Sequence, residues 1–285
     1  MSERPREPFH WRTAIAYKTQ PRIVVRGYDL NELTGNVSFA EMVHLVWKGE
    51  LPSPNVARML DALLVSMCEH AFSPSTVACR FAIAGGATLS AGLAAGIISM
   101  GTRHGVAELP ARTFQEAMRR VREEGRSIAE VADETVREHR QRRLTLYGFH
   151  HPQHLRDPRV ARLVELAREY GVAGEHLELA LAMEEATERH YGRRLYLNDP
   201  GIIAAICLDM GFDPEQAKGI AVLSRALGLI AHCHEEMTRE RPWRASSGAD
   251  IVQPLDLELQ RPEFYDGPPD RELPPQRRRQ FRLGE

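Results

Sequence analysis

The stretch Tyr147–Arg159 reads YGFHHPQHLRDPR, and its Asp-Pro pair marks the start of a helix. Asp157 is a favoured N-cap residue, and proline is favoured at the first helical position, ahead of the periodic run VARLVELAREY. Two further Asp-Pro openings follow, Asp199-Pro200 before GIIAAICLDMG and Asp213-Pro214 before a run to about Glu240. These openings predict helices through the second half of the chain.

Helical signals extend to both sides of this stretch. Breaks at Gly171 and Gly192 predict helices of roughly 158–170 and 174–191. Three pairs read as capping boxes that open helices: Ser38 with Glu41, Thr113 with Glu116, and Ser127 with Glu130. Residues 1–22 are polar and irregular, and a strand signal is confined to Arg22–Tyr28, RIVVRGY. The sequence therefore predicts an all-α protein with ten or more helices.

The composition indicates a protein that acts on small molecules. Lys+Arg of 37 against Asp+Glu of 39 gives a net charge of -2, without the basic excess of most proteins that bind nucleic acid or membrane surfaces. The four cysteines lack CxxC spacing, and the N-terminal MSERPREPFHW has no apolar signal-peptide core. We expect reduced thiols, a cytoplasmic location, and no nucleic-acid or membrane partner.

Two segments have unusual composition. Phe81–Gly101 runs 21 residues without a charge, as a membrane span would, but it is rich in Gly, Ala and Ser and contains Gly85-Gly86. Small residues of this kind let helices approach closely in a core or a subunit interface, which is the interpretation we favour. From Ala249 onward, proline and charged residues dominate. We expect the tail 249–285 to be disordered or laid over another surface.

The histidines of the opening stretch lie on a loop that leads into a helix. Imidazoles on such a loop can donate to an oxygen that gains negative charge, and a guanidinium at a helix N-terminus can hold a carboxylate. The histidines and arginines of this stretch are therefore candidates for proton donation and anion binding: His150, His151, His154, Arg156 and Arg159. The alternative is a surface loop that happens to be rich in histidine.

Separated motifs in the chain together resemble the citrate synthase family. They span about residues 22–245 in order: IVVRGYDLNEL with SFAEMVHLVWKGELP, SPSTVACR, GTRHGVAE, YGFHHPQHLRDPR, and LSRALGLIAHCHEE with RPWR. Only residues 53–73 separate the GELP and Ser-Thr motifs, a shortening similar to citryl-CoA lyases and to the citrate-synthase-like module of ATP-citrate lyase. The resemblance implies a multi-helical homodimer, with a catalytic domain over 1–248 whose small-domain portion covers approximately 150–225.

The resemblance also implies roles for individual residues in cleaving citryl-CoA to acetyl-CoA and oxaloacetate. His104 would donate, as a neutral imidazole, to the thioester oxygen that gains charge, and His151 would take the proton of the substrate hydroxyl. Arg159, Arg225 and Arg241 match carboxylate-binding arginines, with Arg241 reaching into the neighbouring subunit's site. Coenzyme A thioesters are then substrates, and no permanently bound cofactor is expected.

The third catalytic position departs from the family pattern. The family carries Asn-x-Asp at a helix start, whereas this chain reads Asn198-Asp199-Pro200-Gly201, which places Asp199 one residue early. Asp199 is either the acid/base or only a helix cap, as in the other Asp-Pro pairs. His150 and Val106 stand where the family has glycines, so altered acyl specificity is a hypothesis.

Other polar residues carry weaker signals. His154 and Arg156 could contact coenzyme A phosphates or simply face solvent. His232 and Glu236 share a helix face whereas His234 does not, so we predict no metal site there. The other histidines are expected to be surface or structural residues: His10, His44, His70, His139, His176 and His190.

Citryl-CoA lyase activity is the function that the sequence favours. One alternative is a citrate synthase-type enzyme that condenses an acyl-CoA with a 2-oxo acid. An alternative of another class is a catalytically weakened subunit that binds coenzyme A or citrate, which the displaced Asp199 would suit.

Overall fold

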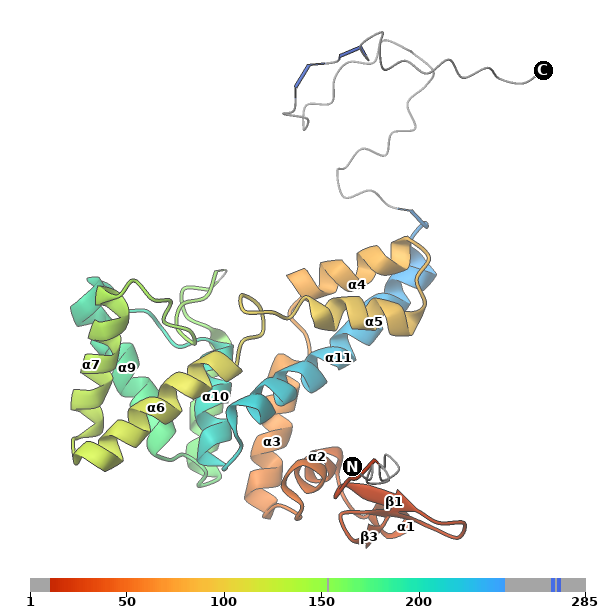
Figure 1. Cartoon of the computed structure of the whole chain (residues 1–285), viewed down its shortest axis with the longest axis horizontal. Coiled ribbons are helices and arrows are strands. Elements are labelled where there is room, and N and C mark those ends of the chain that lie inside the picture. The colour runs from red at the N-terminus through yellow and green to blue at the C-terminus, as the bar shows by residue number, and fades with distance from the viewer. Residues whose placement is uncertain (1–10, 153, 244–267, 270, 273–285) are drawn as a thin grey trace, which may run out of the picture. The chain divides into compact units, whose positions relative to one another are not determined.

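The computed structural model describes residues 11–152, 154–243, 268–269 and 271–272. In these residues a small sheet precedes a succession of helices (Figure 1). The strands are β1 (Ala16–Lys18), β2 (Ile23–Val25) and β3 (Tyr28–Asp29). The helices are α1 (Leu30–Leu33), α2 (Phe39–Lys48), α3 (Pro54–Met67), α4 (Pro74–Ala84), α5 (Leu89–Ile98), α6 (Glu108–Glu124), α7 (Ile128–Gln141), α8 (Pro158–Glu169), α9 (Glu175–Tyr191), α10 (Asp199–Asp209) and α11 (Pro214–Arg239).

Most predicted helix starts are confirmed. Ser38 and Ser127 form capping boxes at α2 and α7, and Asp157 and Asp213 cap α8 and α11. The capping box predicted at Thr113 is wrong, because α6 already begins at Glu108 and the Thr113 hydroxyl donates to the Leu109 carbonyl inside the helix. The apolar face of α6 extends to Pro110 and Ala111, which are buried. Tertiary packing of this face therefore overrides the local capping signal, and the helix begins before Thr113.

The N-terminal segment contains a strand that the sequence did not predict. Ala16 pairs with Val25 and Lys18 with Ile23, so β1 lies antiparallel to β2, and β3 completes an antiparallel order β1-β2-β3. All three residues of β1 are exposed, which removes the apolar alternation that would have marked it in the sequence.

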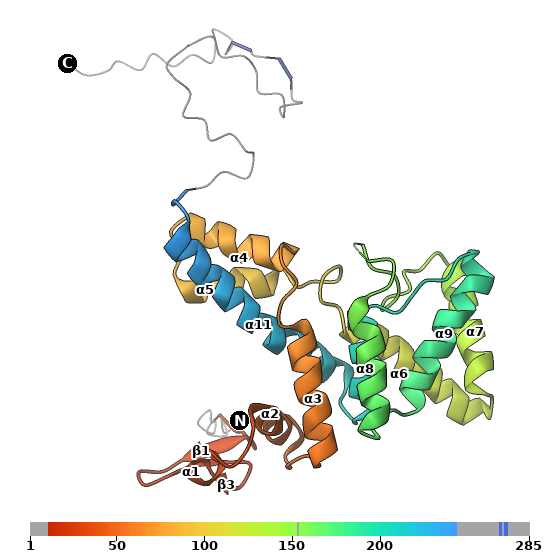
Figure 2. The ribbon, with the colours of Figure 1, turned by 180° about the vertical axis from the view of Figure 1, so that it is seen from behind.

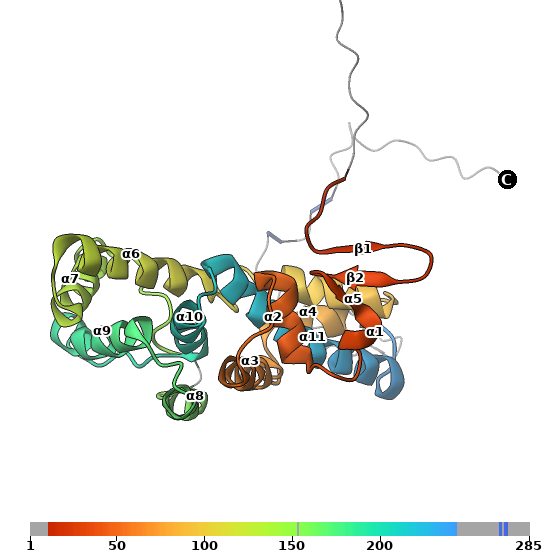
Figure 3. The same cartoon turned by 90° about the horizontal axis from the view of Figure 1, so that it is seen from below.

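α10 is the central helix of the packing. Residues 201–208 are all buried, so this helix is apolar around its whole circumference rather than along one stripe. Ile202, Ile203 and Ile206 pack in one hydrophobic cluster with α2, α3, α8 and α11. Ala204 and Leu208 pack in a second cluster with α6, α7 and α9, and Figure 3 shows α10 between α9 and α11. A side chain at the N-terminus of α10 therefore lies in a water-poor environment.

The helices around the second cluster come from both sides of residue 150, and the predicted small domain of 150–225 stays a prediction. α6 and α7 pack with α9, so the helices around the second cluster begin before residue 150. α8 lies next to α3 when the molecule is viewed from behind (Figure 2). The chain divides into two compact units, Met1–Arg244 and Ala245–Glu285, and every helix and strand given above belongs to the first. Apart from positions 268–269 and 271–272, the predicted tail lies outside the described residues.

The uncharged segment Phe81–Gly101 forms the end of α4 and the whole of α5, separated at Gly85-Gly86. Gly96 lies so close to α4 that an added Cβ would be 3.0 Å from the Ser75 carbonyl oxygen. The small residues thus allow close helix packing, as the sequence indicated. Among the described residues, no helix is long and apolar enough to cross a membrane.

Candidate active site

A cavity of about 440 Å³ opens where several loops converge on α8, α10 and α11. His104, His151, Arg159 and Arg225 all line it, although they come from distant parts of the chain. Asp199 lines the same cavity from the first turn of α10. The remaining polar or charged lining residues include His70, Thr102, Arg103, Thr145, Tyr147, His150 and Asn198. The structure therefore brings most of the predicted residues together in one cavity.

A close contact between two glycines fixes the histidine loop against α10. The backbone N–H of Asn198 donates to the Gly148 carbonyl at 3.0 Å, and a Cβ on Gly201 would lie 2.2 Å from that same oxygen. Gly148 itself has a φ of 88°. His150 adopts a φ of 66°, and its carbonyl accepts from the Asn198 side chain at 2.7 Å. Glycine at both contact points thus holds the loop and the start of α10 at a fixed spacing.

His104 lies on the loop between α5 and α6. Its Nε2 is 2.8 Å from the Ser75 hydroxyl, and Nδ1 makes no hydrogen bond within the described part of the chain. Lys218 on α11 donates to the carbonyls of Met100 and Gly105, which pins both sides of the loop. Burial, with the positive charges of Arg225 and Lys218, lowers the pKa of His104 to about 4. His104 is therefore a neutral imidazole at neutral pH, with one ring nitrogen available to a substrate.

His151 stands beside two other imidazoles, of which His70 was not singled out by the sequence. His70 follows α3, and its ring centroid is 5.3 Å from that of His151, which is 4.6 Å from that of His154. The backbone N–H of His154 donates to Nδ1 of His151 at 3.2 Å, so the ring proton of neutral His151 lies on Nε2. Burial lowers the pKa of His70 and of His151. His70 carries no motif of its own; only proximity in space reveals it.

Asp199 is not the N-cap of α10, because Asn198 accepts from the Gly201 N–H and takes that place. The Asp199 carboxyl is 1% exposed, and its Oδ2 accepts from Arg159 Nη1 at 2.8 Å. Its Oδ1 has no hydrogen-bond partner among the described residues. Burial raises the pKa of Asp199 to about 7, although Arg159 opposes this. A carboxyl with this pKa can take or give a proton near neutral pH.

The two arginines of the cavity have different surroundings. Arg159 is fully engaged, since Asp157 binds it through two hydrogen bonds of 2.9 and 2.7 Å in addition to the bond with Asp199. Burial would raise the pKa of Asp157, but its hydrogen bonds with Arg159 outweigh this and hold that pKa below its usual range. Arg225 is 4% exposed, and its Nε and Nη1 have no partner within the described chain. The guanidinium with unused donors is therefore that of Arg225.

Three predicted residues do not line the cavity. Arg241 lies exposed beyond the end of α11, and about 21 Å of helix separates Arg225 from the last residue of α11. Arg156 is exposed; it donates to the Tyr196 hydroxyl at 2.8 Å, and its guanidinium carbon is 4.4 Å from that ring's centroid. His154 is half-buried at the edge, against His151 and His70. The roles predicted for these three stay predictions.

This geometry defines a class of helical proteins whose cavity joins neutral imidazoles, a buried carboxyl group of raised pKa and a guanidinium with free donors. Such a set suits carbon acids and carboxylates. The sequence family described as "Citrate synthase, C-terminal domain" matches residues 51–246. The chain belongs to the citrate synthase family.

Individual relatives show how this chain compares in length. The glyoxysomal citrate synthase of Cucurbita maxima is 28% identical over 194 residues, which cover 65% of this chain and 36% of that protein. The chain thus spans about a third of that curated relative. Citryl-CoA lyase from Hydrogenobacter thermophilus superposes with a TM-score of 0.80 and 36% identity, covering 93% of this chain and 97% of the lyase. ATP citrate lyase of Methanosaeta concilii, in complex with (3S)-citryl-CoA, shares the fold at a TM-score of 0.69 and 22% identity, over 84% of this chain and 41% of that one.

Proposed function

We propose that this protein is a citryl-CoA lyase that cleaves citryl-CoA to acetyl-CoA and oxaloacetate. The observation that carries the proposal is the cavity in which His104, Asp199 and Arg225 meet. The likeness to the Hydrogenobacter lyase over nearly the full length of both chains supports it, because that protein has the same short form. Coenzyme A thioesters are then substrates rather than bound cofactors.

The proposed reaction breaks one carbon–carbon bond and moves two protons. His151 takes the proton of the substrate hydroxyl, which requires the hydrogen bond from the His154 N–H to Nδ1 to be released or rearranged. The alkoxide collapses to the ketone of oxaloacetate, and the departing two-carbon unit becomes the enolate of acetyl-CoA. His104 donates to the enolate oxygen, and protonated Asp199 delivers a proton to the carbon. The free donors of Arg225 hold a substrate carboxylate.

The test is a pair of assays on the purified full chain. Citryl-CoA is added in one assay and acetyl-CoA with oxaloacetate in the other, and both oxaloacetate and free thiol are followed. We expect oxaloacetate from citryl-CoA without release of free thiol. Replacing His104 with glutamine should lower that rate by about 10²–10³, as expected for loss of an oxyanion donor.

The other outcomes of these assays identify the rival functions. Free thiol from acetyl-CoA and oxaloacetate would indicate a citrate synthase-type enzyme and overturn the lyase proposal. No product in either assay would favour a subunit that binds coenzyme A or citrate without turnover.

We further propose a homodimer in which Arg241 enters the partner's cavity. α4, α5 and α11 pack together, and they expose several large apolar side chains. Ile98 is 82% exposed and Phe81 is 56% exposed, and the others are Val77, Leu89, Leu227, Ile230 and Met237. Exposed apolar surface of this kind marks an interaction site. The position of Arg241 outside the cavity of its own chain agrees with a role in the partner.

Replacing Ile98 with glutamate should break this dimer, because the change buries an unpaired carboxylate in an apolar interface. We expect the wild type to elute as a dimer in size-exclusion chromatography with light scattering, and the variant as a monomer. The variant should also lose most cleavage activity, because each cavity would lack the partner's Arg241. Val65→Glu, at a side chain of α3 that is 64% exposed, is the matched control. A wild-type monomer with full activity would contradict the proposal.

We also infer that Arg156 and His154 bind coenzyme A phosphates, since Arg156 is exposed near the cavity and already oriented by Tyr196. A cytoplasmic location is supported by the four cysteines, all of which are free thiols.

A further inference from the structure

An ammonium group from α11 holds the two ends of the loop that carries His104. Lys218 Nζ donates to the Met100 carbonyl at 2.9 Å and to the Gly105 carbonyl at 2.7 Å. Glu108 Oε2, in the first turn of α6, lies 3.6 Å from the same nitrogen, and both of these charged side chains are 17% exposed. The ammonium, which has three N–H donors, therefore has all of its described partners in one segment of the chain.

The loop has few other attachments. Its ends meet, since a Cβ on Gly105 would lie 2.7 Å from the terminal methyl carbon of Met100. Within the described residues, hydrogen bonds from distant parts of the chain reach this loop only through Lys218 and through Ser75, which contacts the His104 ring. Without the two lysine bonds, the loop would be tied to the surrounding helices mainly through the imidazole that has to act on the substrate.

Lys218 shares one face of α11 with the guanidinium that the proposed reaction assigns to a substrate carboxylate. Arg225 follows Lys218 by seven residues, which is close to two full turns of helix and about 10 Å along its axis. α11 is a continuous helix of 26 residues, so both side chains project from one rigid element. The spacing between the His104 loop and the carboxylate ligand is therefore set by α11.

We propose that Lys218 is a positioning residue, which fixes the His104 loop at the spacing from Arg225 that cleavage of the substrate requires. Lys218 does not line the cavity, so it acts through the loop and not on the reacting atoms. A misplacement of about 1 Å can lower a rate by about a hundredfold, which is the effect expected when the loop loses this attachment. The catalytic consequence rests on the proposed function, whereas the attachment of the loop does not.

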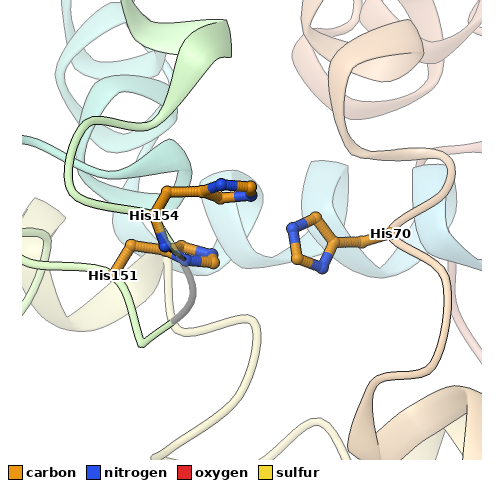
Figure 4. A group of neighbouring side chains, drawn as sticks. All are labelled: His70, His151 and His154. Carbon is orange, nitrogen blue, oxygen red and sulfur yellow. Dashed lines mark hydrogen bonds between the residues drawn. The ribbon is translucent and has the colours of Figure 1, made fainter.

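The same ammonium contributes to the charge state of the imidazole. Burial lowers the pKa of His104 most, followed by the charges of Arg225, Lys218 and His70 in that order. His70 has the smallest effect of these, and its ring faces two imidazoles of the histidine loop (Figure 4). Removing the charge of Lys218 should therefore raise the pKa of His104, an effect that a lysine with only a structural role would not produce.

The kinetic test compares Lys218→Met with Lys218→Arg in the purified full chain. Methionine keeps an unbranched stem without charge or donors, so kcat for citryl-CoA cleavage should fall by about 10². KM should stay within about threefold of the wild type, because Arg225 is left in place. Arginine keeps the charge and N–H donors, and should restore kcat to within about tenfold of the wild type. Lys48→Met is the matched control, because Lys48 also donates to a distant carbonyl, that of Gly211, and its loss should leave the rate unchanged.

NMR titration of the imidazoles gives a readout that does not depend on activity. His104 should titrate at about pH 4 in the wild type and at a higher pH in Lys218→Met. An unchanged rate in folded Lys218→Met, or a lower rate with His104 titrating as in the wild type, would overturn the proposal. Should methionine prevent folding, Lys218→Gln replaces it, since glutamine keeps a donor without the charge. Absence of cleavage by the wild type would refute the proposed function, and the His104 titration would then decide the role of Lys218.

Discussion

Replacing Asp199 with asparagine is expected to lower the kcat for citryl-CoA cleavage by about 10³, because general acid–base catalysis contributes about 10²–10⁴. Asparagine keeps the shape of the side chain and can still accept a hydrogen bond from Arg159, but it cannot deliver a proton to the enolate carbon. Its amide fits the first turn of α10 as the carboxyl does, so the fold should be retained. The measurement is the steady-state rate of oxaloacetate formation from citryl-CoA.

The pH dependence of the wild type provides a second signature of Asp199. Cleavage needs the protonated carboxyl and condensation needs the carboxylate. Because the pKa of Asp199 is raised to about 7, cleavage should slow as pH rises through 7, and condensation should accelerate over the same range. The two profiles should therefore cross, and the crossing should vanish in the asparagine variant.

The same carboxyl should make stability depend on pH. Its pKa is higher in the folded protein than in the unfolded chain, where it is about 3.8, so folding takes up a proton between these values. The stabilisation is complete below the unfolded pKa and is lost as pH rises through 7. Relative to Asp199→Asn, the wild type should therefore lose stability as pH rises from about 4 to about 7 and change little above that, as measured by urea unfolding.

Asp213→Asn is the matched control for this series. Asp213 caps α11 outside the cavity, and asparagine caps a helix about as well, so both rate and stability should stay near those of the wild type. Wild-type activity in Asp199→Asn would show that Asp199 is not the acid/base, although the alternative role of a helix cap belongs to Asn198.

Much of the helical fold could be predicted because its helix starts are local signals. An N-cap side chain such as Ser127 or Asp157 bonds to a backbone N–H two or three residues away, so both partners stand together in the sequence. The start of α6 escaped prediction for the opposite reason, because α6 packs against α9 and α10, which lie far along the chain. Strand β1 escaped although its partner β2 follows closely in the sequence, because its own side chains face solvent and show no apolar alternation.

The residues of the site likewise divide into those that the sequence could predict and those that it could not. His104, His151, Arg159 and Arg225 stand in motifs that resemble a known family, and the structure places all four along one cavity. His70 and Lys218 stand in no recognised motif, and each acts on residues distant in sequence, His70 on the histidine loop and Lys218 on the His104 loop. The engagement of Arg159 with two carboxylates was also invisible in the sequence, because its bond to Asp199 spans 40 residues.

Replacing Arg159 or Arg225 with glutamine is expected to separate a structural from a substrate-binding arginine. Loss of Arg159 leaves Asp157 and Asp199, both almost fully buried, without a cationic partner. Breaking a buried ion pair in this way costs about 3–5 kcal/mol, so Arg159→Gln should unfold at a markedly lower urea concentration. Arg225→Gln should retain or gain stability, because it removes a buried guanidinium with unpaired nitrogens.

The affinity for oxaloacetate should show the opposite pattern, with the larger loss in Arg225→Gln. A carboxylate held by two charged hydrogen bonds loses about 3 kcal/mol when the guanidinium is removed, which is about a 10²-fold weaker Kd for oxaloacetate in Arg225→Gln. Calorimetry on the folded variants measures this, with Arg58→Gln on the exposed surface of α3 as a control for loss of a positive charge. Arg225→Lys should recover part of the affinity, since lysine keeps the charge without the fork of donors.

The effects on stability and on binding have opposite patterns in the two variants. A general loss of folding would lower stability and binding together in either variant. Removal of a dedicated substrate ligand from a buried cavity instead lowers binding and leaves stability intact. Should Arg225→Gln bind oxaloacetate as the wild type does, Arg225 is not a carboxylate ligand. Arg159 would then have to exchange its bond with Asp199 for one with the substrate. Asp199 would be left buried without a cation, which favours the protonated carboxyl that cleavage requires.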